Sequence, residues 1–455
     1  MHTASENNGP TLRGLLGQYP IQTRILRDLD TKSILNLCQT SWDMRTDIRA
    51  YLWNIDEKLE RFFKDPKAFR SALGRADALI SGSFALQFFA HEFWPESDLD
   101  INLRDGGENA GSLAKHLMEV EGYELASNQD IESSPYGTLG ADGFSYRLGD
   151  ISRIQTFIKG NESNSKNKTG NSSSVAAQQK VQLITTKNQP VQAILNGYYT
   201  SCIVNFISWN KAYCVFPRAT LLFRETVPLT PPHDNNVELH KKYSRRGWRL
   251  RTEALYLYRP RVIPMMSTST SAQPQQQKKT KPKYRGRFWP LGFDAFNERR
   301  VGGADTWTMS LSTAGVSRPP QPDSVLEYSC FRMDGFGPEQ SVFAGNGRYN
   351  GIKICARVFE SPSLRYEYTI GYLSPFWEWF GDMLARNTLG QLQVKMEEEE
   401  RLQLTRDFSV HLFSLRFDKP DGWDYWDDVL PDMFEQWREQ MADTAGGAGA
   451  SSSPV

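Results

Sequence analysis

Two short apolar runs separated by a Gly-Ser turn constrain this chain more than any other feature. Leu79-Ile80 leads into Ser81-Gly82-Ser83, residues 84–93 are compatible with a helix, and a second apolar run carries Asp98 and Asp100. Side chains alternate between the two faces of a strand, so carboxylates two residues apart project from the same side. The pattern therefore predicts a strand, a turn into a helix, and a second strand with two acids on one face.

Paired carboxylates next to a helix start suit one kind of ligand. Two carboxylates held this close repel each other unless a cation shares them, and Mg²⁺ takes oxygen ligands in this way. The free N–H groups and the positive dipole end of a helix suit a phosphate. Together these features indicate a site for a nucleoside triphosphate bound with Mg²⁺.

The order Gly-Ser, helix, Asp-x-Asp resembles the fingerprint of the nucleotidyltransferase superfamily, which shares the DNA polymerase β catalytic core. The resemblance implies that Gly82 and Ser83 contact the triphosphate, and that Asp98 and Asp100 are catalytic residues that ligate the metal. Residues 61–103 are also similar to a group of uncharacterised fungal proteins with this fingerprint. The resemblance covers a minority of the chain and implies an α/β fold, with a nucleotidyltransferase-like mixed sheet flanked by helices.

The sequence departs from this fingerprint at the third carboxylate. The superfamily supplies one more acid from a later strand, but the later strand candidates here carry Gln182 or Asn205 at the central polar position. An amide can ligate Mg²⁺ but brings no charge and cannot take a proton from an attacking hydroxyl. Glu132, Asp142 and Asp150 remain alternatives for the missing acid. We therefore expect one Mg²⁺ ion, with a two-metal site as the alternative.

A basic helix is expected at 235–260. In proteins with the nucleotidyltransferase fold a following helical segment closes over the nucleotide, and by this analogy Lys241 and Arg245 contact the triphosphate, with Lys242 and Arg246 as alternatives. A solvated basic face is the competing interpretation, because charge runs on helices usually face water. Nucleic-acid binding through this helix is a further hypothesis, and it predicts affinity that falls steeply with salt.

Residues 15–55 read as short helices and resemble a degenerate F-box, the module that docks a Skp-type adaptor of cullin-type ubiquitin ligases. The resemblance depends on Pro20, the Ile25-Leu26 pair and the apolar residues from Ile34 to Leu37. The alternative is a helical cap on the next domain, and apolar periodicity cannot separate the two.

Composition indicates how many domains the chain has and in which cellular compartment it is expected. A chain of 455 residues, 39% of them hydrophobic, suggests two or three domains with sizeable cores. Five cysteines without C-x-x-C pairs favour reduced thiols inside the cell and disfavour a zinc site. Since no signal segment or apolar run long enough for a membrane span is present, we expect a cytoplasmic or nuclear protein without membrane contact.

Segment composition predicts the remaining organisation. Helices are also expected at 58–73, 112–121 and 191–198, and strands at 151–158, 180–184, 202–207 and 212–216. The predicted units are a disordered start (1–14), the F-box-like segment (15–55), a nucleotidyltransferase-like domain (56–230) with a disordered insert (160–178), the basic helix (235–260), a linker (265–285), an aromatic-rich α+β region (286–442) and a disordered tail (443–455).

Two functions from different classes follow. The first is an enzyme that transfers a nucleotidyl group from a Mg²⁺-nucleoside triphosphate to an unknown acceptor, with Asp98 and Asp100 holding the metal. The second is a catalytically inactive scaffold, in which the nucleotidyltransferase fold is a sensor and the N-terminal helices recruit a ligase adaptor. The missing third acid and the F-box-like helices both favour the second.

Overall fold

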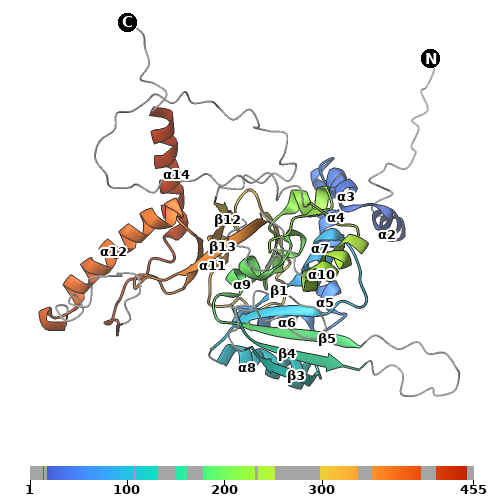
Figure 1. Ribbon diagram of the computed structural model, residues 1–455, viewed down its shortest axis with the longest axis horizontal. Helices are drawn as coiled ribbons and strands as arrows, with labels where there is room; N and C mark the ends of the chain where they lie inside the picture. The colour runs from blue at the N-terminus through green and yellow to red at the C-terminus, as the bar shows by residue number, and fades with distance from the viewer. Residues whose placement is uncertain are drawn as a thin grey trace, which may run out of the picture.

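A mixed eight-stranded sheet forms the centre of the molecule (Figure 1). The computed structural model describes residues 14, 18–106, 108–131, 150–160, 178–230, 234–251, 298–336, 351–400 and 417–447. The strands of the sheet are β1 (Leu79–Ser81), β2 (Leu99–Arg104), β3 (Glu124–Asp130), β4 (Ile151–Lys159), β5 (Gln179–Thr186), β6 (Asn205–Ile207), β7 (Lys211–Cys214) and β11 (Trp307–Ser310). Their order is β11-β7-β6-β1-β2-β5-β4-β3, in which β2 and β5 run parallel and the other neighbours antiparallel. The predicted α/β class is confirmed.

The expected strand–turn–helix–strand unit lies at the centre of this sheet. Helix α7 (Gly82–Ala90) connects β1 to its antiparallel neighbour β2. Leu99, Ile101 and Leu103 are fully buried on one face of β2, and Asp100 and Asn102 are buried on the other. Because both faces of the sheet are covered, the Asp100 carboxyl group lies in the protein interior.

Gly82 makes the turn from β1 into α7. Its φ of +68° lies in the left-handed region that residues with a Cβ rarely adopt. A Cβ at this position would overlap Oδ2 of Asp100 and would lie 3.3 Å from the Tyr198 hydroxyl oxygen. Both the backbone conformation and the close approach of the carboxylate therefore require glycine here.

Helices on either side of this unit follow the predicted pattern in most places. Helix α8 (Glu108–Lys115), which continues to Val120, and α9 (Pro190–Gly197) correspond to predicted helices. The single helix predicted over 58–73 is wrong, since the chain forms α5 (Ile55–Leu59) and α6 (Pro66–Arg75). Pro66 begins a new helix, and the Asp65 carboxylate caps it by accepting from the N–H groups of Lys67 and Ala68.

The N-terminal segment is helical, as expected, and packs on the main core. It comprises α2 (Tyr19–Asp28), α3 (Thr31–Cys38) and α4 (Trp42–Leu52). Ile34 and Ile48 are buried in the same core as the large sheet. The Thr31 hydroxyl donates a hydrogen bond to the carbonyl oxygen of Ala90 at the end of α7, at 2.8 Å. These helices therefore form one folded unit with the sheet.

Strand β11 joins the large sheet from the region predicted as a separate C-terminal unit, 286–442. It pairs antiparallel with β7. The buried guanidinium group of Arg70 in α6 strengthens this connection, because it donates to the carbonyl oxygens of Trp209 and Ser312 and pairs with Asp56 at 2.7 Å. Segments far apart in the sequence are thus joined around one buried cation.

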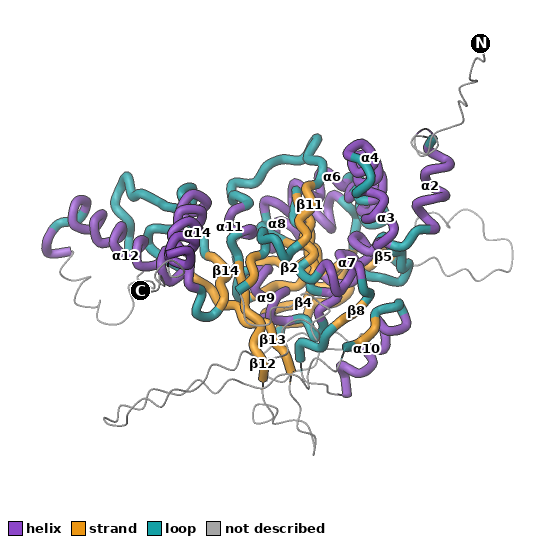
Figure 2. The backbone as a smooth tube through the Cα atoms, turned by 90° about the horizontal axis from the view of Figure 1, so that it is seen from above, coloured by secondary structure: helices purple, strands orange, loops and turns teal. Residues whose placement is uncertain are grey.

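A smaller four-stranded sheet and the helices α11, α12 and α14 form the described C-terminal part (Figures 1 and 2). Tyr368, Phe376, Trp377 and Phe380 are buried in a second hydrophobic core in this part of the chain. The tail predicted to be disordered begins at residue 443, but helix α14 continues to Gly447. The elements are β10 (Arg299–Arg300), α11 (Ser324–Glu327), β12 (Cys330–Phe336), β13 (Gly351–Phe359), β14 (Tyr368–Gly371), α12 (Pro375–Lys395) and α14 (Leu430–Gly447).

The basic helix is shorter than predicted. Helix α10 (Asp234–Arg245) ends before Gly247, whose φ is +93°, and β9 (Arg249–Leu250) then pairs in parallel with β8 (Glu225–Thr226). The described residues do not include 1–13, 161–177 of the predicted insert, the predicted linker or 252–260. Within the described ranges, no helix is long and apolar enough to cross a membrane.

The Gly82 geometry predicts the effect of adding a single methyl group. Gly82→Ala and Gly106→Ala both place alanine at a positive φ, which costs about 1–2 kcal/mol. Only position 82 adds an overlap, because nothing lies within 4 Å of a Cβ at Gly106. We expect urea unfolding to show Gly82→Ala destabilised by about 1–3 kcal/mol more than Gly106→Ala. Equal losses would show that the turn does not press on Asp100.

Candidate functional site

Three neighbouring strands present a row of polar side chains at the centre of the large sheet. Ser81 of β1 lies opposite Asp100 of β2, which lies opposite Gln182 of β5. Directly opposed residues share one face of a sheet, so these side chains project together. The Asn102 amide donates to Ser81 Oγ at 2.6 Å, and Ser81 Oγ lies 2.6 Å from the Tyr198 hydroxyl oxygen. This network fixes the residue that precedes the Gly-Ser turn.

The start of α7 contacts α10 through Ser83. Its Oγ lies 2.8 Å from the hydroxyl oxygen of Tyr243, in a buried hydrogen bond. The N-cap residue Ser81 makes no side-chain hydrogen bond to the first turn of the helix. Helix α10 is therefore anchored on the Gly-Ser turn. The side chain of the N-cap residue Ser81 leaves the N–H groups at the start of α7 without a capping hydrogen bond.

A cavity of about 250 Å³, here called the aspartate cavity, lies where α7, β2, β5 and α10 meet. The segment that leads into β2 closes one side of it. Of the predicted site residues, Ser83, Asp98 and Asp100 line this cavity, and Gly82 packs against the Asp100 carboxylate. Its lining is Ser83, Glu96, Ser97, Asp98, Asp100, Lys180, Lys242 and Arg246.

Asp100 is the most deeply buried acid of the aspartate cavity. Only 2% of its surface is exposed, and its Oδ1 has no hydrogen-bond partner among the described residues. Burial, followed by the negative charge of Asp98, raises the pKa of Asp100 from 3.8 to about 7. A nearby cation or a hydrogen-bond donor would stabilise the charged form of this carboxyl group.

Asp98 already has a basic partner. Its Oδ2 lies 3.0 Å from Nζ of Lys180 at the start of β5. The parallel register explains this contact, because Leu99 lies opposite Val181 and the preceding residues of the two strands are therefore neighbours. The two aspartates thus differ, since one is paired with a lysine and the other is buried with an unpartnered oxygen.

The structure places the predicted contacts Lys241 and Arg245 outside the aspartate cavity. Both side chains are mostly exposed, and both lie beside Glu238 on the outer face of α10. Lys242 and Arg246 line the cavity instead. The two pairs are one residue apart and therefore occupy different faces of the helix.

An aromatic ring and a carboxylate hold Arg246, one of the three basic side chains of the aspartate cavity. The Arg246 guanidinium lies 3.9 Å from the centre of the Trp94 ring, and its Nη2 is 2.6 Å from Glu96 Oε1. Burial and the positive charge of Arg246 lower the pKa of Lys242. Both cations therefore lie in surroundings that would favour an additional anion.

The position expected to carry a third acid carries an amide. Gln182 lies directly across from Asp100, whereas the Asn205 amide donates to the carbonyl oxygen of Cys202 on the far side of β1. Asp150 lies at the opposite end of β5, where Lys187 donates its N–H to the Asp150 carbonyl. The alternatives Glu132 and Asp142 lie outside the described residues.

Glu96 is the third acid that does line the aspartate cavity, and the sequence analysis missed it. It lies two residues before Asp98, so its proximity in sequence was a usable signal. Its carboxylate is paired with Arg246, and most of the side chain is exposed. Across the described part of the chain, no three His, Cys, Asp or Glu side chains gather in a metal-binding cluster.

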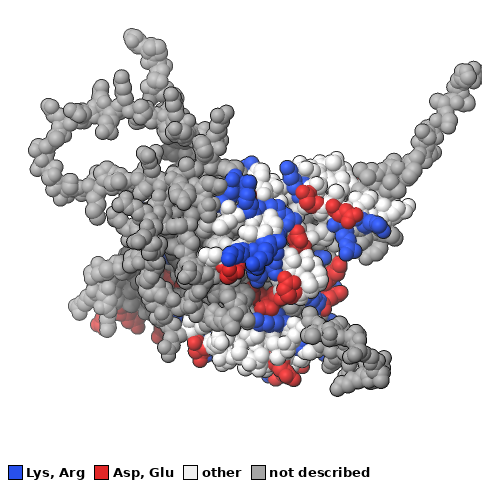
Figure 3. Space-filling view, turned by 45° about the vertical axis from the view of Figure 1, so that its right-hand side comes forward, with Lys and Arg blue, Asp and Glu red and all other residues white. Residues whose placement is uncertain are grey.

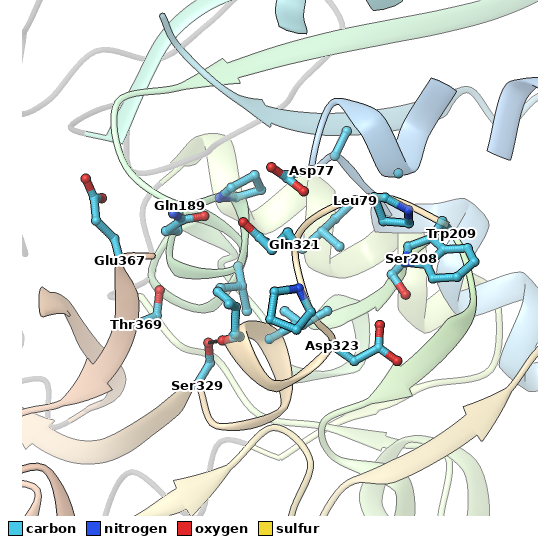
Figure 4. A pocket seen from close by; sticks show the side chains of 18 residues that line it. Asp77, Leu79, Gln189, Ser208, Trp209, Gln321, Asp323, Ser329, Glu367 and Thr369 are labelled. Carbon is cyan, nitrogen blue, oxygen red and sulfur yellow. Dashed lines mark hydrogen bonds between the residues drawn. The ribbon is translucent and has the colours of Figure 1, made fainter. Parts of the chain in front are cut away.

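A second cavity, of about 50 Å³, lies between α6, α9 and the segment before α11 (Figure 4). Figure 4 shows the polar side chains of Asp77, Gln189 and Gln321 gathered around it. This volume holds a few water molecules rather than a nucleotide. Burial raises the pKa of Asp77 to about 6. None of the predicted site residues lines this cavity.

Basic and acidic side chains are interspersed on the face shown in Figure 3. Several cations of α10 and its surroundings are paired with acids, including Lys241 with Glu238 and Arg224 with Glu92. Such pairs reduce the local positive charge that nucleic-acid binding requires. On this face the charge pattern therefore gives no support to the nucleic-acid hypothesis.

Gly82, Ser83, Asp98 and Asp100 thus come together in the fold, whereas the predicted contacts Lys241 and Arg245 lie elsewhere. No family model, curated protein or solved structure matches this chain. The function is therefore inferred from the residues of the aspartate cavity and their geometry.

The partly buried carboxyl group of Asp77 predicts a pH dependence of stability. A carboxyl pKa that is higher in the folded state means that the folded protein binds more protons, so stability is lost as pH rises from about 4 to about 6. Asp77→Asn should remove this loss and raise the free energy of unfolding at pH 7.5 by roughly 1–3 kcal/mol. Asparagine also tolerates the φ of +48° at this position. Urea unfolding at pH 4.5 and 7.5 tests this, and identical pH profiles for both proteins would contradict it.

Proposed function

We propose that this chain is a nucleotidyltransferase-fold protein that binds a nucleoside triphosphate together with Mg²⁺ in the aspartate cavity. One observation carries the proposal: Ser83, Asp98 and Asp100 converge with three basic side chains on one cavity of about 250 Å³. Acids alone would repel a polyphosphate, and bases alone would not attract a metal. The mixture fits a ligand in which anionic oxygens and a divalent cation are bound together.

The phosphate groups have suitable partners on two sides of the cavity. On one side, α7 offers the Ser83 hydroxyl and the N–H groups of its first turn. On the other, the chain offers Lys242 of α10 and Arg246, which directly follows this helix. An Arg fork can bind two phosphate oxygens at once, and a lysine acts as a point charge. Because Tyr243 joins Ser83 to α10, both groups of donors are held in one arrangement.

The negative charges of Asp98 and Asp100 repel each other, and a Mg²⁺ ion bound between them would offset this repulsion. The buried Oδ1 of Asp100 lacks a partner, and the charge of Asp98 disfavours its ionisation. When bound, Mg²⁺ would supply positive charge that both carboxylates and the phosphate oxygens share. Gln182, which lies opposite Asp100, offers an amide oxygen of the kind that Mg²⁺ accepts.

Thermal unfolding with nucleotides tests the proposal. Each of the four nucleoside triphosphates is added with and without Mg²⁺ to the wild type and to the double variant Asp98→Asn/Asp100→Asn. At about a hundredfold excess over the dissociation constant, a bound ligand adds roughly 2.7 kcal/mol to the free energy of unfolding. We expect a Mg²⁺-dependent rise in the unfolding temperature of the wild type that the double variant loses. No rise with any nucleotide would refute the site.

Two adjacent lysines provide a matched control. Lys242 lines the aspartate cavity, whereas Lys241 lies on the outer face of the same helix. Lys242→Gln should weaken nucleotide binding by about tenfold or more, since it removes a charge-assisted hydrogen bond. Lys241→Gln should leave binding unchanged. Equal effects of the two changes would point to a general electrostatic attraction instead of a defined site.

Nucleotidyl transfer from this site would need a proton acceptor. The acceptor hydroxyl oxygen forms a bond to the α-phosphorus, the bond to the bridging oxygen breaks, and pyrophosphate leaves while the hydroxyl proton passes to a base. Gln182 cannot take that proton. Its position opposite Asp100 specifically favours the second candidate, a catalytically inactive protein that binds nucleotide without transfer.

The amide at position 182 allows the two candidates to be separated. We expect the wild type to transfer labelled nucleotide slowly or not at all, and Gln182→Glu to raise the rate by about 10²–10⁴. Gln182→Met keeps the size without the charge and should give no gain. Nucleotide binding without transfer in all three proteins would leave the inactive binding protein as the function.

The scaffold candidate also includes the N-terminal helices as a docking site for a Skp-type ubiquitin-ligase adaptor. Ile34 is fully buried in the main core, and Leu35 and Leu37 are half-buried against it. These residues are therefore occupied in holding α3 on the sheet. This packing supports the alternative role of the segment as a helical cap on the nucleotide-binding unit.

A further inference from the structure

Another cavity, larger than the aspartate cavity, lies in the C-terminal part of the chain. It has a volume of about 370 Å³ and lies between β10, β12, the start of α12 and α14. We call it the aromatic cavity, because the rings of Tyr328, Phe376, Trp377, Phe434 and Trp437 line it. The two cavities share no lining residue. Its volume lies within the range of small-molecule sites in proteins.

Three buried polar atoms in the lining of the aromatic cavity lack hydrogen-bond partners among the described residues. They are Oε2 of Glu298, Nε of Arg332 and the indole Nε1 of Trp437. Buried polar groups are almost always hydrogen-bonded, since leaving one unpaired costs free energy. One acceptor and two donors around a single cavity therefore indicate a ligand with polar groups.

The charges around the aromatic cavity favour an anion. Arg300 and Arg332 both line it, against the single carboxyl group of Glu298. The guanidinium of Arg300 lies 4.5 Å from the centre of the Tyr328 ring and 4.2 Å from that of Phe434. These two contacts hold the cation in place between two rings.

The start of α12 adds to the positive potential. Residues Pro375 to Trp377 form the first turn of this 21-residue helix and line the cavity. The positive end of the helix dipole therefore lies at the cavity wall.

Burial raises the pKa of Glu298, so this carboxyl group tends toward its neutral form, in which it can donate a hydrogen bond.

We propose that the aromatic cavity binds an aromatic anion, a flat ring that carries a carboxylate or phosphate group. The ring packs against the aromatic side chains, Arg332 and the Trp437 indole N–H bind the anionic group, and Glu298 pairs with a polar atom at the ring edge. This site is independent of the proposed nucleotide site and would remain if that site failed.

Calorimetric titration of the full chain with four ligands that share one ring system tests the proposal. The ligands are 2-naphthoate, 2-naphthyl phosphate, the neutral 2-naphthamide and the cationic 2-naphthylmethylammonium. We expect an anion to bind at least about tenfold more tightly than the amide, because charge-assisted hydrogen bonds are stronger than neutral ones. The better of the two anions identifies the natural acidic group as carboxylate or phosphate. No binding, or preference for the amide or the cation, would overturn the proposal.

Three variants locate the binding. Arg332→Gln should weaken anion binding by about tenfold or more, and Trp437→Phe should weaken it while keeping the ring in place. Arg357→Gln is the matched control, because Arg357 is an exposed arginine on the neighbouring strand β13 that does not line the cavity. Circular dichroism checks folding, and Trp437→Phe decides the result if Arg332→Gln does not fold. Equal affinity in Trp437→Phe and the wild type would then overturn the assignment.

Discussion

Gly82 brings the backbone against the carboxylate of Asp100 in a contact that no larger residue permits. The rest of the aspartate cavity depends on this approach. It sets where α7 begins and therefore places Ser83, whose hydroxyl binds Tyr243 of α10. Through that bond, a segment from a distant part of the sequence presents Lys242 of α10 and the following Arg246 to the same cavity. A single backbone contact thus determines which charged groups meet.

The pKa values of an acid and a base in the aspartate cavity are shifted in opposite directions. Burial raises the pKa of Asp100 and lowers that of Lys242, so the protein interior disfavours the charged form of each group. Interactions between charges are stronger in such surroundings than in water, because the effective dielectric constant is lower. A ligand that carries both signs of charge would relieve both groups at once. The aromatic cavity differs, since its unpartnered atoms are mainly donors and its neighbouring charges mainly positive.

Local patterns in the sequence were enough to predict the central unit, and contacts between distant segments were not. Gly82 and Ser83 predict the turn, and the spacing of Asp98 and Asp100 predicts two acids on one face of a strand. The choice between Lys241 and Lys242 depends on which face of α10 packs inward. Leu239 and Tyr243 are buried, so their helical spacing could have indicated the cavity face. Pro66 was a visible helix start, whereas the pairing of β11 with β7 leaves no local signal.

The position of β11 has a consequence for how the chain is made. Until residues 307–312 have left the ribosome, β7 has an open edge and Arg70 lacks the Ser312 carbonyl as an acceptor. An open strand edge is a template for pairing with other chains. The nascent protein must therefore keep this edge from pairing wrongly while the long segment between β9 and β10 is synthesised, and a chain terminated within that segment would expose it permanently.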